Sequence, residues 1–320
     1  PDVLKFEEVE KPTPKDNEVL IKIYAASVNT GEFYFLTGKP FLVRLSPGGL
    51  LKPKITILGG DVAGRVEAVG VNVKQFQPGD DVFGDISESG MGAFAEYVSA
   101  PENVLTKKPA SLSFEEAAAI PTSGVTALQG IRDSGEIQPG QKVLIVGASG
   151  GVGTYAVQIA KYFRAEVTAV CSTGKIELVR SIGADHIIDY TQEDFTQSGQ
   201  QFDLIIAVNG YHSISDYKGA LNPEGIYVCI GGKMKQIFAS LILGPLLSKK
   251  GGKQIRNMGS VKINQNDLVV MKELFEAGKV IPVIDRRYPL SETAEAFRFF
   301  GEGHAKGKVI ITVTVVEDGE

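Results

Sequence analysis

The sequence predicts a mixed α/β protein that combines a β-rich domain with a doubly wound parallel sheet covered by helices. Up to about residue 110, short apolar runs rich in β-branched and aromatic residues are separated by Pro, Gly and Asp, which is typical of strands joined by turns. Beyond that point, continuous apolar runs alternate with helical stretches, which indicates a parallel sheet with both faces covered. We expect domains at 1–120 and 121–264, with 265–320 completing the first.

Each domain can be divided into elements in chain order. In the first we expect strands at 18–28, 64–73, 81–86 and 93–100, followed by a capped helix, a proline turn and a second helix within 111–131. In the second we expect strands at 142–148, 166–172, 186–190, 202–209 and 225–231 with helices between them. The tail reads as a helix over 267–278 and a strand pair, 280–285 and 306–316.

Composition excludes several classes of function. The formal net charge is −5 with both signs interspersed, so no basic face is offered to nucleic acid. No run of 18 apolar residues suggests a membrane span. Cys171 and Cys229 are too few for a disulfide framework, which favours a reducing, cytoplasmic location. Because the chain begins at Pro1, a targeting peptide removed ahead of it is compatible with the sequence.

Two glycine-rich stretches compete as the nucleotide-binding loop. Residues 57–70, ILGGDVAGRVEAVG, lead into another strand, so their glycines are better explained as bends and close contacts in a small β-barrel. Residues 142–163, KVLIVGASGGVGTYAVQIAKYF, run from a buried strand straight into a helix. That context suits a dinucleotide pyrophosphate, which binds free N–H groups at a helix start. The predicted contacts are Ser149, Gly150, Gly151, Val152 and Gly153, with Ala148 in place of the first glycine.

The end of the next strand bears on which dinucleotide is bound. NAD-selective sites place a carboxylate about 20 residues past the glycines, whereas Cys171 to Lys175 offer hydroxyls and an ammonium without an acid. Ser172 and Lys175 therefore favour the 2′-phosphate of NADPH, and Tyr190 adds a hydroxyl. In the alternative interpretation, Ser172 and Thr173 only cap the next helix and Lys175 is a solvated charge.

At this point the sequence resembles a known group, the zinc-independent quinone oxidoreductase branch of the medium-chain dehydrogenase/reductase superfamily. The resemblance covers nearly the whole chain. It is carried by AASVNTGEFYFLTG, GGDVAGRVEAVG, QPGDDVFG, IPTSGVTALQGI, GASGGVGTYAVQIAKYF, VRSIGADHIIDY and GHAKGKVIITV. It implies a GroES-like barrel, a Rossmann domain, an active site in the cleft between them and a homodimer.

The resemblance also addresses zinc. Metal-dependent relatives hold catalytic zinc with cysteine, histidine and cysteine. Here those positions appear as Asn29, Asp61 and a residue near Thr122, so we expect no metal. The three histidines are scattered and are better explained as structural or solvated than as ligands: His186, His212 and His304.

Without a metal, the chemistry would come from the cofactor's hydride. The resemblance implies that Asn29 and Tyr34 lie beside the nicotinamide ribose and the substrate, where the tyrosine hydroxyl can bond a carbonyl that gains charge. Barrel packing is the alternative for Tyr34. Thr126 matches a nicotinamide contact, or else bonds back to its own helix. The predicted ends of sheet strands add Asn209, Gly231 and Gly232.

Residues 233–257 join a strongly apolar stretch to a basic run. This segment is open to three roles, a substrate-pocket lip, a dimer contact or a membrane-surface helix, but a buried helix followed by a solvated loop is the favoured account.

The leading hypothesis is a zinc-independent, NADPH-dependent oxidoreductase that transfers hydride to quinones or other α,β-unsaturated carbonyl compounds. A metal-free carbonyl or alcohol dehydrogenase is the second. The third is of another class, an NADPH-binding sensor or structural protein with little catalysis.

Overall fold

A computed structural model describes residues 1–39, 55–248 and 251–313. The chain divides into two compact units. Unit 1 comprises 1–122, 263–276 and 284–320, and unit 2 comprises 123–262 and 277–283. This division departs from the boundaries expected from sequence most clearly at 277–283, which belongs to the second unit. The Gln158 side chain accounts for this, since its amide donates to the Ile281 carbonyl (3.0 Å) and accepts from the Ile281 N–H (2.8 Å).

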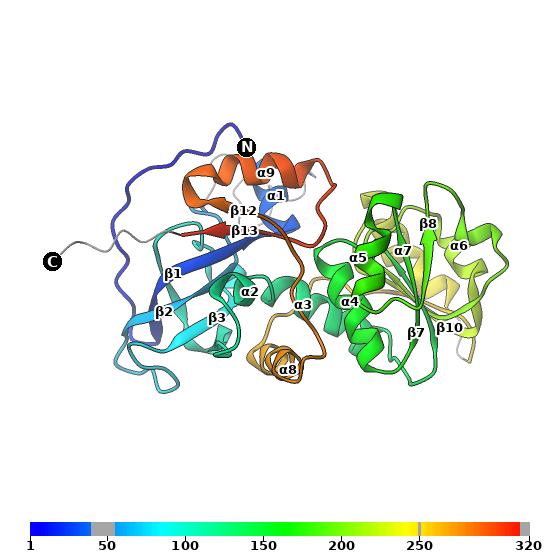
Figure 1. The fold of residues 1–320 in the computed structure, drawn as a ribbon, viewed down its shortest axis with the longest axis horizontal. Coiled ribbons are helices and arrows are strands. Elements are labelled where there is room, and N and C mark those ends of the chain that lie inside the picture. The colour runs from blue at the N-terminus through cyan, green and yellow to red at the C-terminus, as the bar shows by residue number, and fades with distance from the viewer. Residues whose placement is uncertain (40–54, 249–250, 314–320) are drawn as a thin grey trace. The chain divides into compact units, whose positions relative to one another are not determined.

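Unit 1 is built on a seven-stranded sheet whose main path runs β12-β13-β1-β2-β3-β5, with β4 also paired to β1. The first strands, β1, β2 and β3, lie side by side in Figure 1. The bounds are β1 Glu18–Val28, β2 Asp61–Val69, β3 Asp81–Asp85, β4 Tyr97–Pro101, β5 Leu105–Lys107, β12 Ile284–Pro289 and β13 Lys308–Thr312. Its helices are α1 Thr30–Thr37, α2 Phe114–Ala118, α8 Gln265–Glu276 and α9 Thr293–Gly301.

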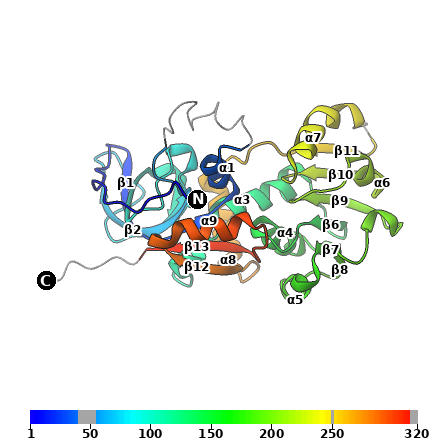
Figure 2. The ribbon, with the colours of Figure 1, turned by 90° about the horizontal axis from the view of Figure 1, so that it is seen from above.

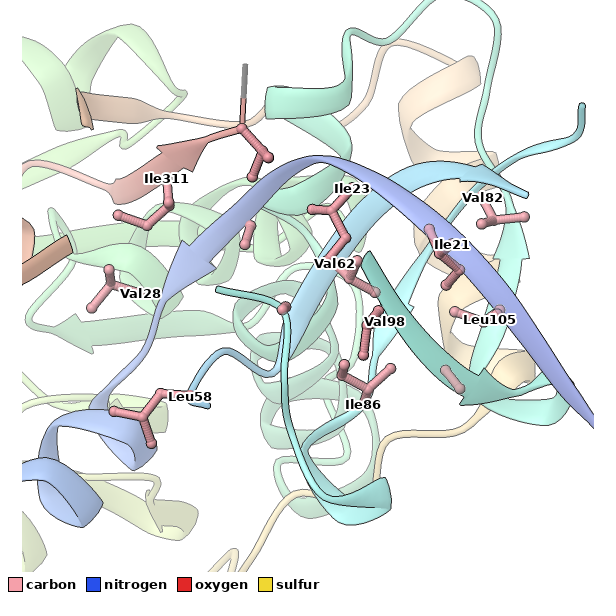
Figure 3. Close-up of a cluster of buried hydrophobic side chains, with 14 of the residues drawn as sticks. Ile21, Ile23, Val28, Leu58, Val62, Val82, Ile86, Val98, Leu105 and Ile311 are labelled. Atoms are coloured by element: carbon pink, nitrogen blue, oxygen red, sulfur yellow. The ribbon is translucent and has the colours of Figure 1, made fainter. Parts of the chain in front are cut away.

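Inward-facing aliphatic side chains fill the interior of this unit. Ile21, Ile23 and Val62 of adjoining strands lie within one buried cluster (Figure 3), as alternation along pleated strands requires. The glycines of 57–70 serve this packing, as predicted: a Cβ at Gly64 would lie 2.2 Å from the Lys22 carbonyl oxygen. This stretch is therefore a barrel strand and not a nucleotide loop.

The C-terminal tail does rejoin the first unit. Strand β13 pairs antiparallel with β1, aligning Ser27 with Ile310. Its partner β12 runs parallel to it and begins at Ile284, so most of the predicted strand 280–285 precedes the observed one. Those residues lie in the segment held by Gln158, which removes them from the barrel. The last predicted strand extends past residue 313, beyond the described residues.

Unit 2 contains a six-stranded sheet in the order β11-β10-β9-β6-β7-β8, all parallel, and Figure 2 shows the strands in that sequence. The bounds are β6 Lys142–Val146, β7 Glu166–Cys171, β8 His186–Asp189, β9 Phe202–Ala207, β10 Leu221–Cys229 and β11 Gln254–Asn257. The helices are α3 Pro121–Leu128, which starts at the end of unit 1, a π-helical turn Gln129–Ser134, α4 Gly151–Tyr162, α5 Ile176–Ser181, α6 Ile214–Gly219 and α7 Met234–Leu247.

The order of these strands identifies the ligand-binding edge of the sheet. Strand β6 lies between β7, the next strand in sequence, and β9, so the strand order reverses at β6. In open parallel sheets, ligands bind at the carboxyl ends of the strands around such a reversal. We therefore expect a nucleotide to bind at the loops after β6 and β9.

The apolar-basic segment differs from its favoured interpretation. It forms α7 and β11, but several of the helix's large apolar side chains are exposed, including Leu246 at 78%. A buried helix is thus the wrong description of this segment. Among the described residues no helix has the length and apolarity needed to cross a bilayer.

Candidate active site

The predicted dinucleotide loop has the required geometry. Strand β6 ends at Val146, and α4 begins at Gly151 with Gly150 as its N-cap and no side chain capping it. The N–H groups of a first helical turn have no partner within the helix, and the helix dipole adds positive potential there. This end of α4 is therefore suited to an anion such as a pyrophosphate.

Two glycines in this turn are required by space. A Cβ at Gly153 would lie 2.1 Å from the Gly147 carbonyl oxygen, so only glycine fits this close approach of helix and strand. Gly147 itself has φ of +85° and a Cβ there would lie 2.9 Å from Cβ of Asn209. Sequence analysis missed Gly147 by looking for the first glycine at Ala148, although its place directly after the strand was a usable signal.

The other predicted residues of the strand ends come together around this loop. The Asn209 N–H donates to the Val146 carbonyl at 3.2 Å, which places the end of β9 against the end of β6. After β10, the Gly231 N–H donates to the Ala207 carbonyl at 3.1 Å, and Gly232 forms a bridge with Gly210. Asn209 and Gly231 therefore lie at the same edge of the sheet as Ser149 to Gly153.

The segment after β7 lies next to a carboxylate that the sequence analysis did not place there. Ser172 makes no capping hydrogen bond, and the Thr173 hydroxyl donates to the Asp189 carboxylate at the end of β8. Asp189 also accepts from the Thr191 N–H and hydroxyl. The pKa of Asp189 is lowered, and the largest cause is the hydrogen bond from Thr173. A carboxylate thus lies next to the segment, but threonines occupy both of its oxygens.

The remaining cofactor candidates are placed as follows. Tyr190 directly follows β8, is 52% exposed, and has its ring 5.9 Å from that of Tyr211. Lys175 is half-buried at the end of a short 3₁₀ turn. Thr126 is buried within α3.

Asn29, Asp61 and Thr122, the three positions compared with zinc ligands, lie together in unit 1. The Asn29 amide donates to Asp61 Oδ2 at 2.9 Å, and the Thr122 N–H and hydroxyl donate to Asp61 Oδ1 at 2.9 and 2.7 Å. Asp61 is fully buried. Its second oxygen also accepts from the Ser27 hydroxyl at 2.7 Å.

A lysine that sequence analysis missed completes this cluster. The Lys308 ammonium lies 2.5 Å from Asn29 Oδ1 and 3.3 Å from Asp61 Oδ2, and the residue is only 2% exposed. The motif that contains it, GHAKGKVIITV, was used in the sequence analysis only as part of the family resemblance. A lysine directly before an apolar run was the available signal, since lysine is almost never fully buried unless paired.

This donor set does not fit a catalytic zinc ion. Zinc sites are built from thiolate, imidazole and carboxylate around a tetrahedral cation. Here the amide oxygen of Asn29 and the carboxylate of Asp61 accept from an ammonium, and the Thr122 hydroxyl donates to that carboxylate. The positive charge that Asp61 requires is supplied by Lys308. The cluster is therefore suited to hold the Lys308 ammonium and not a metal ion.

Thr122 also connects Asp61 to a second buried carboxylate, Asp85. The Thr122 hydroxyl lies 2.7 Å from Asp61 Oδ1 and 2.6 Å from Asp85 Oδ2, but its single proton can serve only one of them. Burial, together with the charge on Asp61, raises the pKa of Asp85. Thr122 thus links the carboxylates of Asp61 and Asp85 in one hydrogen-bond network.

Helix α1, which carries Tyr34, starts from the same cluster. The buried Glu32 carboxylate accepts from the N–H of Asn29, the N-cap residue, and from the N–H of Gly60 at 2.9 Å. Burial, and next the charge on Asp61, raises the pKa of Glu32 to about 8. Both ends of the Asn29 amide are used inside this network, so the residue fixes the start of α1.

Tyr34 lines a cavity and is not a member of the barrel core cluster. Phe33, Phe35 and Leu36 pack against that core, and Tyr34 is absent from the cluster. It instead lines a cavity of about 490 Å³ together with Phe33, Thr37, Lys39 and Pro1. Packing alone therefore does not explain this tyrosine.

The histidines lie apart from this cluster. His186 is exposed beside Glu166 at 2.8 Å, and His304 is exposed. His212 packs among the rings of Phe195, Tyr211 and Tyr217. Both cysteines are free and buried, and burial raises the pKa of each thiol.

Comparison with known proteins agrees with this architecture. The alcohol dehydrogenase GroES-like domain family matches residues 15–110, and the zinc-binding dehydrogenase family matches residues 182–311. A chloroplast envelope quinone oxidoreductase homolog of Arabidopsis thaliana is 35% identical, covering 96% of this chain and 93% of the relative. The 2-methylene-furan-3-one reductase of Solanum lycopersicum is 37% identical, covering 97% and 76%. The structure of the quinone oxidoreductase from Coxiella burnetii superposes with a TM-score of 0.85 at 28% identity, covering 98% and 96%.

The protein is an oxidoreductase with a GroES-like domain and a Rossmann-type domain. The chain belongs to the medium-chain dehydrogenase/reductase superfamily, in its zinc-independent, quinone oxidoreductase-like branch.

Proposed function

We propose that the protein uses NADPH to reduce quinones or other α,β-unsaturated carbonyl compounds by hydride transfer, without zinc. The observation that carries this proposal is the Lys308 ammonium among the positions of the metal ligands, 3.3 Å from Asp61 Oδ2. Because that place already holds a cation, the carbonyl must be activated by other groups. The relatives named as quinone oxidoreductases and as a 2-methylene-furan-3-one reductase support this substrate class.

In this proposal the cofactor is held by the loop of unit 2. The N–H groups from Ser149 to Gly153 bind the pyrophosphate, Ser172, Lys175 and Tyr190 bind the 2′-phosphate, and Asn209, Gly231 and Thr126 line the nicotinamide half. Bound NADPH supplies the hydride, which goes to the electron-poor carbon of the substrate.

Tyr34 is the proposed catalytic residue. Its hydroxyl donates a hydrogen bond to the substrate carbonyl, which gains negative charge as the hydride arrives at the conjugated carbon. The same hydroxyl can pass a proton to that oxygen, to be replaced from water. Its position on a cavity wall supports this role. Asn29 acts with it by fixing the start of α1, and its contact with the nicotinamide ribose is part of the same proposal.

The test is NADPH oxidation by purified protein against a panel of quinones, enones and short aldehydes. Turnover of quinones or enones supports the proposal. Turnover of aldehydes alone would instead indicate a metal-free carbonyl dehydrogenase. NADPH binding with no turnover of any substrate would indicate a sensor or structural protein.

We further propose a homodimer located in the cytoplasm. Relatives named as chloroplastic and mitochondrial exist, so cell fractionation with compartment markers is the relevant measurement. Sedimentation velocity of the purified chain tests the dimer.

A further inference from the structure

Helix α7 exposes most of its large apolar side chains, whereas its buried positions are small or polar. Its buried positions are Gln236, Ser240 and Gly244, which recur at every fourth residue and are polar or small. A helix on a protein surface ordinarily buries its large apolar residues and exposes its polar ones. In α7, Ile237 and Leu247 pack partly against the core, but most of the large apolar side chains lie on the exposed side.

Specific contacts fix this orientation. The Gln236 amide donates to the Tyr227 hydroxyl at 2.6 Å, and Asn257 Nδ2 of β11 donates to the Ser240 hydroxyl at 2.6 Å. At Gly244 a Cβ would lie 2.8 Å from the Ile255 carbonyl oxygen, so the helix backbone approaches β11 closely. Figure 2 shows α7 beside β11. Rotating the helix to bury its apolar face would break both hydrogen bonds.

The opposite side, which we term the outer face of α7, presents large apolar side chains to solvent. Leu246 is 78% exposed, Ile242 63% and Leu241 57%, with Phe238 and Leu243 above 40%. Contiguous exposed apolar residues on this scale indicate a surface that binds another protein or a membrane.

The charge around α7 indicates which of these binding partners fits the outer face. From residue 225 to 266 the sequence contains six lysines, one arginine and no acidic residue, within a chain of net charge −5. Lys233 and Lys235, at the start of α7, are exposed. An apolar helical face flanked by cations is the pattern of helices that lie in the interface of an anionic bilayer.

The same charges disfavour a second copy of the chain. A two-fold dimer through this face would set each patch against itself, and so would bring two acid-free, lysine-rich segments together. At 14 residues the helix is about 21 Å long, too short to cross a hydrocarbon core of about 30 Å. It can only lie along the surface.

We propose that the outer face of α7 binds the surface of an anionic lipid bilayer, with Leu241, Ile242 and Leu246 inserted among the headgroups. Binding is peripheral and depends on salt, because screening weakens the attraction between lysines and lipid charge. The proposal does not depend on the reaction assigned above.

The chain contains no tryptophan, so a single introduced tryptophan reports its own surroundings. Leu246→Trp places one on the outer face, and Val71→Trp places one at a residue of unit 1 that is 86% exposed. On titration with vesicles of phosphatidylcholine and phosphatidylglycerol, the emission of Leu246→Trp should shift to the blue, and that of Val71→Trp should not. High salt should reverse the shift, and phosphatidylcholine alone should give a much smaller one.

Vesicle co-sedimentation of otherwise unchanged protein gives a second measurement. The double variant Ile242→Ser with Leu246→Ser should bind at least about tenfold more weakly than the wild type, while Val71→Ser should bind equally. Absence of both the blue shift and co-sedimentation would overturn the proposal. A protein dimer that this double variant dissociates, without vesicle binding by the wild type, would also overturn it, since a second copy would then cover the face.

Discussion

Lys308 and Asp61 form an ion pair inside the barrel of unit 1, with Nζ 3.3 Å from Oδ2 and exposures of 2% and 0%. Both groups have further hydrogen-bond partners, Asn29 for the ammonium and Ser27 and Thr122 for the carboxylate. A buried pair is tolerated in such surroundings because each charge is fully compensated. The pair explains how the barrel keeps a buried aspartate at this position.

Removal of the ammonium should destabilise the protein strongly. In Lys308→Met, Asp61 would stay buried without its counter-charge, which costs about 3–5 kcal/mol. Urea denaturation followed by circular dichroism measures this. Lys306→Met, at an exposed lysine two residues away, should change stability by less than about 0.5 kcal/mol. Equal effects of the two variants would contradict the assigned pair.

Glu32 should make stability depend on pH in a definite direction. Burial raises its pKa from 4.5 to about 8 in the folded state, so between these values the folded protein binds more protons than the unfolded chain. Stability contributed by Glu32 is therefore complete below pH 4.5 and is lost as pH rises to about 8, with a slope of at most about 1.4 kcal/mol per pH unit.

Glu32→Gln tests this dependence. The variant should be less stable throughout, because Gln cannot accept from both Asn29 and Gly60, but the decline of stability between pH 5 and 8 should be shallower than in the wild type. Glu88→Gln, at an exposed position, should keep the wild-type slope. Parallel curves for Glu32→Gln and the wild type would show that Glu32 does not titrate in this range.

Tyr34→Phe should separate catalysis from binding. Loss of a single hydroxyl that stabilises developing charge typically lowers kcat by about 10²–10³. NADPH affinity should not change, because the Tyr34 hydroxyl is assigned to the substrate carbonyl and not to the cofactor. Steady-state kinetics with a quinone and fluorescence titration with NADPH measure the two quantities. Tyr162→Phe, at an exposed tyrosine, is the matched control. Unchanged kcat in Tyr34→Phe would remove the proposed role.

The glycine of the phosphate loop should be essential for cofactor binding. In Gly153→Ala the new Cβ would lie 2.1 Å from the Gly147 carbonyl oxygen, so the turn must move and its N–H groups no longer converge. We expect NADPH to bind at least about 100-fold more weakly. Gly219→Ala, where nothing lies within 4 Å of the added Cβ, should bind normally. Normal binding by Gly153→Ala would place the pyrophosphate elsewhere.

Lys175 should decide between NADPH and NADH. If its ammonium binds the 2′-phosphate, Lys175→Ala should weaken NADPH by roughly tenfold and leave NADH unchanged. Fluorescence titrations with both nucleotides measure this selectivity. Equal wild-type affinities for NADPH and NADH would refute the assignment of Ser172 and Lys175, whatever the variant does.

The sequence by itself determined whatever depends on local pattern. The buried strand 142–146 followed at once by a glycine turn and a helix specified the dinucleotide loop, because strand, turn and helix are contiguous in the chain. Continuous apolar runs specified the parallel sheet for the same reason. The glycines of 57–70 could be assigned to a barrel because the residues after them form strands.

Only the tertiary structure decided which distant residues share an environment. Lys308 lies 247 positions from Asp61, and no local pattern reports that a strand near the C-terminus pairs with β1 and carries its ammonium to the buried carboxylate. The same holds for Gln158, which assigns 277–283 to unit 2, and for α7, whose apolar run predicted burial. Apolar composition sets a helix's preference for leaving water, but the polar contacts of Gln236 and Ser240 decide which face meets the protein.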